Sequence, residues 1–256
     1  MSIGIPADQA DAQAHLTAAV TALNPPQPND PAWQQAAMQV RADAAEYAQR
    51  WPDDPRGLET VGALSVSLND HEGVDAAFSA LLDTWPENAS AGIAWVNYWQ
   101  THDMTRAISL LENLLTKQPN RLLYINRLHT LLFQVDPERL RARFLAMQEE
   151  GDDDRAAMEL DITARIAPSF AADIGSHLRI TAPNHLPLAV ATARGWRNHN
   201  RFDQARRILS EFDERSFTDP THAYLWSDVL YADHDFAKAH EIMSGIDMDA
   251  IAEDGK

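Results

Sequence analysis

Cysteine is absent from this chain of 256 residues, and glycine occurs only ten times. Without cysteine, the protein has no disulfide bonds and no thiolate ligands for a metal ion. Runs in which valine and isoleucine alternate with polar residues are also missing, so we predict helices rather than a β-sheet. No stretch approaches about 18 apolar residues, and we therefore expect no membrane-spanning segment.

Positive charge is scarce as well, since 21 lysine and arginine residues face 38 aspartate and glutamate residues, for a net charge of −17. Such a surface repels phosphate backbones and anionic lipids, which argues against nucleic acid or a membrane surface as a partner. Residues 1–23 show neither a basic segment nor a continuous apolar stretch, so no signal peptide is predicted. We expect a cytoplasmic protein.

Motifs of the common catalytic and cofactor sites are missing too. The chain has no glycine-rich phosphate loop, no HExxH and no GxSxG. Carboxylates are abundant, but a solvated acidic surface accounts for them and no catalytic pair stands out. We therefore predict no catalytic residues, no cofactor and no metal site, in a protein that is not an enzyme.

The chain is rich in amphipathic helical sequence, and residues 88–121 show its repeating unit most clearly. This stretch predicts two helices, about 89–100 and about 105–117, and Pro119 ends the second because proline lacks an N–H. The apolar residues of the second helix, which share one face, are Ala107, Ile108, Leu110, Leu111, Leu114 and Leu115. A hairpin of this kind cannot bury its apolar face alone, so we expect neighbours of the same kind.

A register runs through the chain when the small or apolar residue early in each second helix is taken as an anchor. The anchors are Val40, Val74, Ala107, Leu140, Ala171, Ala205 and Ala239. Successive anchors are 34, 33, 33, 31, 34 and 34 residues apart, and the residue seven positions after each anchor is apolar. Those residues are Tyr47, Leu81, Leu114, Met147, Leu178, Phe212 and Ile246.

This pattern resembles the tetratricopeptide repeat, whose period is about 34 residues. The resemblance implies an all-α, right-handed α-solenoid of about fourteen helices and a single superhelical domain over residues 1–256. Within it we distinguish a divergent N-terminal pair, regular repeats, degenerate repeats, further regular repeats and an acidic tail: 1–53, 54–121, 122–185, 186–247 and 248–256. Glu159 marks the degeneracy, because it falls where the repeat has a small residue.

Four helix starts are marked by an aspartate directly before a proline, at positions 30–31, 54–55, 136–137 and 219–220. The aspartate side chain accepts hydrogen bonds from the free N–H groups of the first turn, and proline suits the first helical position. These pairs support the same register.

Histidines near acidic residues recur in the turns between paired helices, among them His71, His102 and His234. Metal binding or acid–base chemistry is one interpretation. Successive turns of stacked hairpins, however, lie about 10 Å apart along one edge, whereas the ligands of a metal ion converge to about 2 Å from it. We therefore predict turn residues with a left-handed backbone at Asn69, His102, Asn200 and His234.

In the family that this chain resembles, the first helix of each pair lines an inner, concave surface. By register, that surface carries Trp99, Gln100, Asn126, His129, Phe133, Arg194, Arg197, Tyr224 and Tyr231. Such side chains suit the binding of a peptide or helix, although packing between repeats explains the aromatic residues equally well. Arg194 and Arg197 point to an acidic or C-terminal carboxylate segment as the ligand, and an internal salt bridge is the alternative.

The leading functional hypothesis is a monomeric, non-enzymatic interaction module or scaffold that holds a peptide or partner protein in a concave groove. A related alternative is an interaction region that serves a fused or separately encoded enzyme, such as a chaperone or peptidyl-prolyl isomerase. An α/α-toroid enzyme would need long loops that carry two carboxylates, and this chain predicts short loops. A self-stacking structural protein is disfavoured by the alanine-rich first helix and the acidic tail, which resemble solubilising caps.

Overall fold

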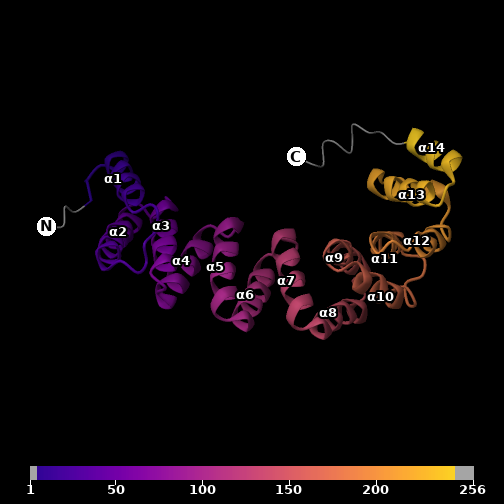
Figure 1. Ribbon diagram of the computed structural model, residues 1–256, viewed down its shortest axis with the longest axis horizontal. Coiled ribbons are helices and arrows are strands. Elements are labelled where there is room, and N and C mark those ends of the chain that lie inside the picture. The colour runs from indigo at the N-terminus through magenta and orange to yellow at the C-terminus, as the bar shows by residue number, and fades with distance from the viewer. Residues whose placement is uncertain (1–4, 246–256) are drawn as a thin grey trace. The chain divides into compact units, whose positions relative to one another are not determined.

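The computed structural model describes residues 5–245, which form fourteen α-helices and one short 3₁₀ helix, without a β-strand among them. The helices are α1 (Gln9–Ala22), α2 (Pro31–Arg50), α3 (Arg56–Ser67), α4 (His71–Thr84), α5 (Ala89–His102), α6 (Met104–Lys117), α7 (Leu122–Val135), α8 (Pro137–Glu150), α9 (Asp153–Ile166), α10 (Pro168–Leu178), α11 (Leu186–Asn198), α12 (Phe202–Leu209), η1 (Glu214–Ser216), α13 (Pro220–Ala232) and α14 (Phe236–Ser244). Figure 1 shows them as successive hairpins. The prediction of an all-α fold with about fourteen helices is confirmed.

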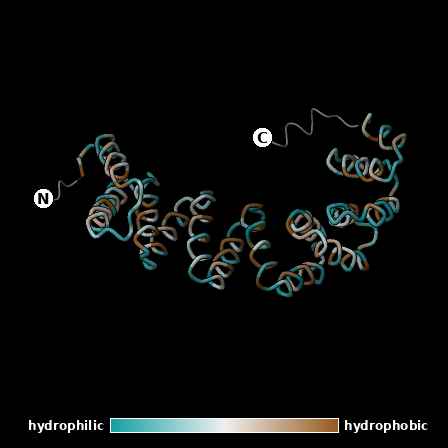
Figure 2. The backbone as a smooth tube through the Cα atoms, viewed as in Figure 1, coloured by the Kyte–Doolittle hydropathy of each residue, from teal (hydrophilic) through white to brown (hydrophobic). Residues whose placement is uncertain are grey.

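The helices gather into two compact units, one that ends at Pro119 and one that begins at Asn120. All seven anchor residues are buried, with none more than 8% exposed, so the register describes the core of both units. Figure 2 shows hydrophobic and hydrophilic residues along the same helices, as amphipathic packing requires. Among the described helices, none has the length and apolar character needed to cross a membrane. Ile246 and the predicted tail 248–256 lie outside the described residues.

Aspartate side chains cap the N-termini of seven of the fourteen described α-helices. Three of the four aspartate–proline starts are confirmed, because the side chains accept first-turn N–H groups of α2, α8 and α13: Asp30, Asp136 and Asp219. The fourth is different, since α3 begins at Arg56 and Pro55 precedes it. Asp54 accepts the Arg56 N–H at 3.1 Å and the Tyr47 hydroxyl at 2.6 Å, so it joins α2 to the start of α3.

Three of the four predicted left-handed turn residues are confirmed. Asn69, Asn200 and His234 have φ angles of 55°, 59° and 65°. The prediction for His102 is wrong, because this residue is the last of α5. Asp103 follows it with an extended φ of −152° and caps α6, so a single residue joins the two helices and no left-handed turn is needed.

One carboxylate holds two tryptophans inside the first unit. Asp75 on α4 accepts the indole N–H groups of Trp95 and Trp99 at 2.7 and 2.8 Å. Arg106 on α6 pairs with the same carboxylate, and its guanidinium carbon lies 3.7 Å from the centroid of the Trp99 ring. The polar edge of Trp99 is thus satisfied within the unit, and its ring is covered by a cation.

A buried ion-pair network fills the degenerate region of the second unit. Glu159 on α9 is fully buried and accepts two hydrogen bonds of 2.6 Å from Arg143 on α8. Arg155 donates a further bond of 3.1 Å, and Nε2 of the buried His129 lies 2.9 Å from the same carboxylate. His129 Nδ1 lies 2.8 Å from the Thr163 hydroxyl. Charged partners therefore occupy the place where a regular repeat packs a small residue.

Candidate functional site

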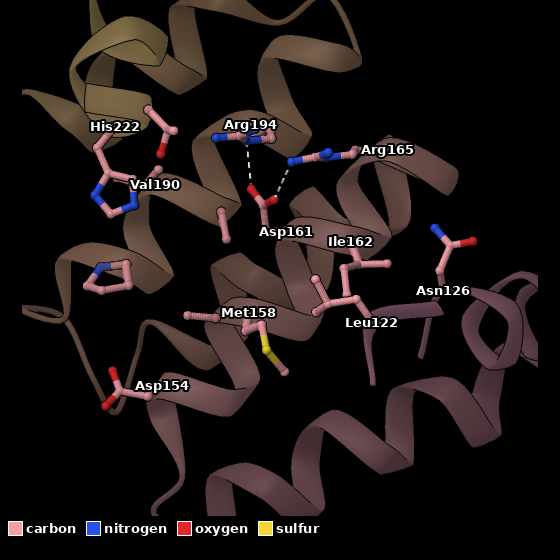
Figure 3. A pocket seen from close by; sticks show the side chains of 14 residues that line it. Leu122, Asn126, Asp154, Met158, Asp161, Ile162, Arg165, Val190, Arg194 and His222 are labelled. Atoms are coloured by element: carbon pink, nitrogen blue, oxygen red, sulfur yellow. Dashed lines mark hydrogen bonds and ion pairs between the residues drawn. The ribbon is translucent and has the colours of Figure 1, made fainter. Parts of the chain in front are cut away.

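A groove opens in the second unit between the first helices of its hairpins, α7, α9, α11 and α13 (Figure 3). It encloses about 510 Å³. Half of its fourteen lining residues are apolar, namely Leu122, Ala157, Met158, Ile162, Pro187, Val190 and Ala191. The polar lining residues are Asn126, Asp154, Asp161, Arg165, Arg194, Thr221 and His222. Apolar surface combined with polar groups that can orient a ligand is typical of a ligand site.

Helical periodicity places these side chains on one side of α9 and α11. The groove residues of α9 recur at positions 154, 157, 158, 161, 162 and 165, while the opposite side carries the buried Glu159 and Leu160. On α11 the groove residues recur at positions 187, 190, 191 and 194. Close packing fixes α11 against α10, since a Cβ on Gly175 would lie 2.4 Å from the Thr192 hydroxyl oxygen. The groove walls therefore rest on tightly packed helices.

Arginines and aspartates form the charged side of the groove. Arg194 Nε lies 2.7 Å from Asp161 Oδ1, and Arg165 Nη2 donates to Asp161 Oδ2 at 3.0 Å. Figure 3 shows Asp161 between these two arginines, joined to both by dashed lines. Arg197 donates from Nε to Asp228 Oδ2 at 2.7 Å. The internal salt bridges that the sequence left open as an alternative are therefore present.

A second hollow of about 320 Å³ adjoins the groove. Its lining residues are Arg165, Arg194, Arg197, Asn198, Thr221, Tyr224, Leu225 and Asp228. Arg165, Arg194 and Thr221 line both hollows, so the apolar groove leads directly to the arginines.

Arg194 on α11 and the ionisable groups at the start of α13 have shifted pKa values. Burial lowers the pKa of Arg194, although the Asp161 charge raises it. Burial likewise lowers the pKa of His222, against the opposing charge of Asp219. Burial raises the pKa of Asp219. The hydrogen bond from the Thr221 side chain and the electrostatic effect of His222 oppose this, and the pKa is lowered overall. His222 is thus neutral at pH 7, and the positive charge of this wall comes from arginine, which stays protonated.

The structure brings four of the predicted site residues together. Asn126 and Arg194 line the groove, and Arg197 and Tyr224 line the adjoining hollow. Tyr231 is exposed on the same helix as Tyr224, but its ring packs against Phe236 at 5.0 Å between centroids.

The other predicted site residues lie elsewhere. Trp99 and Gln100 belong to α5 of the first unit, where Trp99 is buried and bound to Asp75. His129 is fully buried in the Glu159 network and has no surface to offer a ligand. Phe133 is partly exposed and packs against Phe170, with 5.8 Å between the ring centroids.

Sequence reasoning missed most of the α9 wall. The missed groove residues are Leu122, Asp154, Ala157, Met158, Asp161, Ile162, Arg165, Pro187, Val190, Ala191, Thr221 and His222. Those on α9 recur at i, i+3, i+4 and i+7, a spacing that could have identified this wall, but Glu159 made the repeat look irregular.

The expected 10 Å spacing of the histidine turns is wrong for one pair. The rings of His71 and His102 have centroids 5.2 Å apart, because both turn toward Tyr98. His71 Nδ1 lies 2.5 Å from the Tyr98 hydroxyl, and His102 Nδ1 lies 2.7 Å from the Tyr98 carbonyl oxygen. Within residues 5–245, no group of three or more histidine, aspartate or glutamate side chains is arranged to hold a metal ion.

We expect no stoichiometric zinc binding, since tight sites need three or four converging ligands. Calorimetric titration of the full chain with zinc chloride should show no saturable binding near one equivalent. Tight binding that disappears in His71→Ala or His102→Ala would contradict this expectation, while the exposed His199→Ala variant serves as the control.

Comparison with known proteins shows likeness in structure and none in sequence. The chain matches no protein-family model and no curated protein sequence. A crystal structure of a tetratricopeptide repeat protein from Parabacteroides merdae aligns over 94% of this chain and 97% of its own, with 13% identity and a TM-score of 0.34.

Proposed function

We propose that the chain is a non-enzymatic interaction module and that the groove of its second unit binds a peptide segment of a partner protein. The supporting observation is a groove of about 510 Å³, half of whose lining residues are apolar, that leads to a wall of arginines. Leu122 at its edge is 56% exposed, although leucine gains free energy when it is buried. A bound apolar side chain would remove this surface from water.

The helical arrangement supports a peptide rather than a small substrate. The groove is lined by four successive first helices, so it offers a row of apolar contacts for an extended or helical segment. Binding free energy in such interfaces concentrates in a few anchors. We expect those anchors to pack against Met158, Ile162 and Val190, and we expect the chain to act as a monomer.

Two neighbouring leucines provide the test. Leu122 lines the groove, whereas Leu123 does not and is exposed to a similar degree, 49%. Peptides selected from a displayed random library against the full chain should bind Leu122→Glu at least about tenfold more weakly, since one interface anchor contributes ~2 kcal/mol. Binding to Leu123→Glu should remain within about twofold of wild type.

The matched pair separates groove binding from general surface effects. Both variants add one negative charge to the same helix turn, so charge repulsion alone affects them equally. Equal loss in the two variants, or no selected peptide that depends on Leu122, would contradict the proposed groove.

A further inference from the structure

Two small hollows lie in the first unit between α1 and α3, and the proposed peptide groove does not include them. They enclose about 240 and 270 Å³. Val20, Glu59 and Thr60 line both of them, so the two hollows adjoin. Each is smaller than the ~300 Å³ at which pockets for drug-sized ligands begin. A single small group therefore suits each hollow better than a large ligand does.

Apolar surface forms one part of the lining, from side chains that include Leu16, Val20 and Leu64. Trp33 and Tyr47 add aromatic surface, and their polar atoms are already engaged. The Trp33 indole N–H donates to a backbone carbonyl oxygen at 2.8 Å, and the Tyr47 hydroxyl donates to a carboxylate at 2.6 Å. These side chains therefore offer a ligand contact with hydrocarbon and few further donors.

Hydroxyl oxygens form a second part of the lining, and each has already donated its hydrogen. Thr17 donates to the Gln13 carbonyl oxygen at 2.9 Å, Thr21 to the Thr17 carbonyl oxygen at 2.7 Å, and Ser67 to the Ala63 carbonyl oxygen at 3.1 Å. A hydroxyl group has one hydrogen, so these three oxygens can only accept a further hydrogen bond. The lining therefore favours a ligand that donates hydrogen bonds.

Glu59 supplies a negative charge where the two hollows adjoin. Its Oε1 accepts a hydrogen bond from Asn88 Nδ2 at 3.0 Å, and within residues 5–245 its Oε2 has no partner. Arg56 lines one hollow, but its Nη1 lies 3.6 Å from Asp54 Oδ2, so that carboxylate offsets its charge. One negative charge remains at the hollows, and the net charge of −17 on the whole chain adds to the attraction for a cation.

We propose that these hollows bind a primary alkylammonium group, with its nitrogen at Glu59 and its hydrocarbon stem against the apolar lining. An ammonium group is compact and has three donors and no acceptor, which matches a carboxylate surrounded by hydroxyl acceptors. A guanidinium group pairs best with both oxygens of a carboxylate, and Asn88 already occupies Oε1. Calcium requires six or more oxygen ligands, and Glu59 is the one carboxylate among the residues that line these hollows.

The test uses n-butylamine as the probe, which is protonated at pH 7 as the lysine side chain is. It is titrated into the full chain at constant ionic strength, and the methyl signals of Val20 are followed by NMR. Loss of these signals in Val20→Ala assigns them. We expect saturable shifts with a dissociation constant of about 1 to 10 mM, since so small a probe binds weakly.

Three matched probes separate the parts of the interaction. n-Butanol lacks the charge, n-butyltrimethylammonium lacks the N–H donors, and methylammonium lacks the stem. Each should bind at least about fivefold more weakly than n-butylamine, because each loses one of the three contacts. Equal binding of n-butanol would reduce the site to an apolar hollow, and equal binding of methylammonium would reduce it to a surface ion pair. Either result would overturn the inference, as would equal binding of n-butyltrimethylammonium.

Glu59→Gln should weaken n-butylamine binding about tenfold, since a hydrogen bond to a charged group is lost while the shape of the side chain is kept. Glu72→Gln is the matched control, because Glu72 is exposed on α4, lies outside both hollows and changes the net charge equally. It should change binding by less than about twofold, because salt screens distant charges. Equal responses of the two variants would exclude Glu59 as the partner, and circular dichroism should show that both keep their helices.

Two further probes identify the source of the ammonium group. Nα-acetyl-lysine methylamide represents a lysine of a peptide, and spermidine represents a free alkylamine. Whichever binds more tightly names the source, and failure of both to shift the Val20 signals would overturn the inference. Leu122→Glu, in the second unit, should leave n-butylamine binding unchanged, so this site and the peptide groove are tested separately.

Discussion

Replacement of Glu159 by alanine is expected to destabilise the second unit by about 3 kcal/mol or more. The carboxylate is fully buried and binds Arg143, Arg155 and His129. Alanine would leave Nε2 of a fully buried imidazole without its carboxylate partner, and two partly buried guanidinium groups without this carboxylate. Breaking a buried pair by removing one member is among the most damaging single substitutions.

The same network predicts that stability falls in acid. Burial raises the pKa of Glu159, but hydrogen bonds from His129 and Arg143 outweigh it and lower the pKa from 4.5 to about 2. A lowered folded-state pKa stabilises the protein above the unfolded-state value, and this contribution is lost as pH falls from about 4.5 toward about 2. Burial also lowers the pKa of His129 below its usual value of 6.5. As pH falls, the unfolded state therefore binds a proton at this histidine before the folded state does, which reduces stability further.

Urea unfolding of Glu159→Ala and Glu159→Gln, followed by circular dichroism at several pH values, measures both effects. The control is Glu150→Ala, an exposed carboxylate on α8 that should change stability by less than about 0.5 kcal/mol. The difference between wild type and Glu159→Gln should be largest above pH 5 and shrink as pH falls. A difference that does not depend on pH would show that the carboxylate charge is not what stabilises the unit.

Replacement of Ala107 by arginine is expected to destabilise the first unit by about 3 kcal/mol or more, since it overpacks a helix crossing and buries a charge. Ala107 is fully buried near the start of α6, where α5 and α6 pack together. The register places Ala205 and Ala239 at equivalent positions in the second unit, and both are buried. Arginine at either of them should have a comparable effect there.

Ser109→Arg supplies the control for this substitution, because Ser109 is exposed on the same helix. Tryptophan fluorescence during urea unfolding reports mainly on the first unit, because that unit contains five of the seven tryptophans. The midpoint for Ala107→Arg should fall well below that for Ser109→Arg. Equal midpoints would mean that the register does not identify the buried face of α6.

Much of the fold could be predicted from apolar spacing alone. The anchors are buried because helices present residues at fixed intervals, and a face that is apolar in every repeat must turn inward. The Glu159 network could not be predicted this way, since its partners lie 4, 16 and 30 residues away along the chain. A buried charge needs several partners at once, and a single repeat does not reveal them.

The site was predictable only in part, for a related reason. The register assigns a residue to a helix side, but the side chain follows its hydrogen-bonding partner. Trp99 turns to Asp75 and His129 turns to Glu159, so both leave the expected surface. Asn126 and Arg194 line the groove as predicted. The neighbouring α9 residues were not predicted, because Glu159 makes that helix depart from the repeat pattern.

The Glu159 network also limits how the protein can be re-engineered. Repeat arrays lengthen and shorten by gain or loss of whole repeats when every interface between neighbours is interchangeable. Here α9 supplies the carboxylate, while α8 and α7 supply Arg143 and His129. Duplication or excision of the α8–α9 segment would separate these charges from their partners. The α8–α9 segment therefore cannot be duplicated or removed as an independent unit, and designed variants of different length should have their insertions or deletions at other helix pairs.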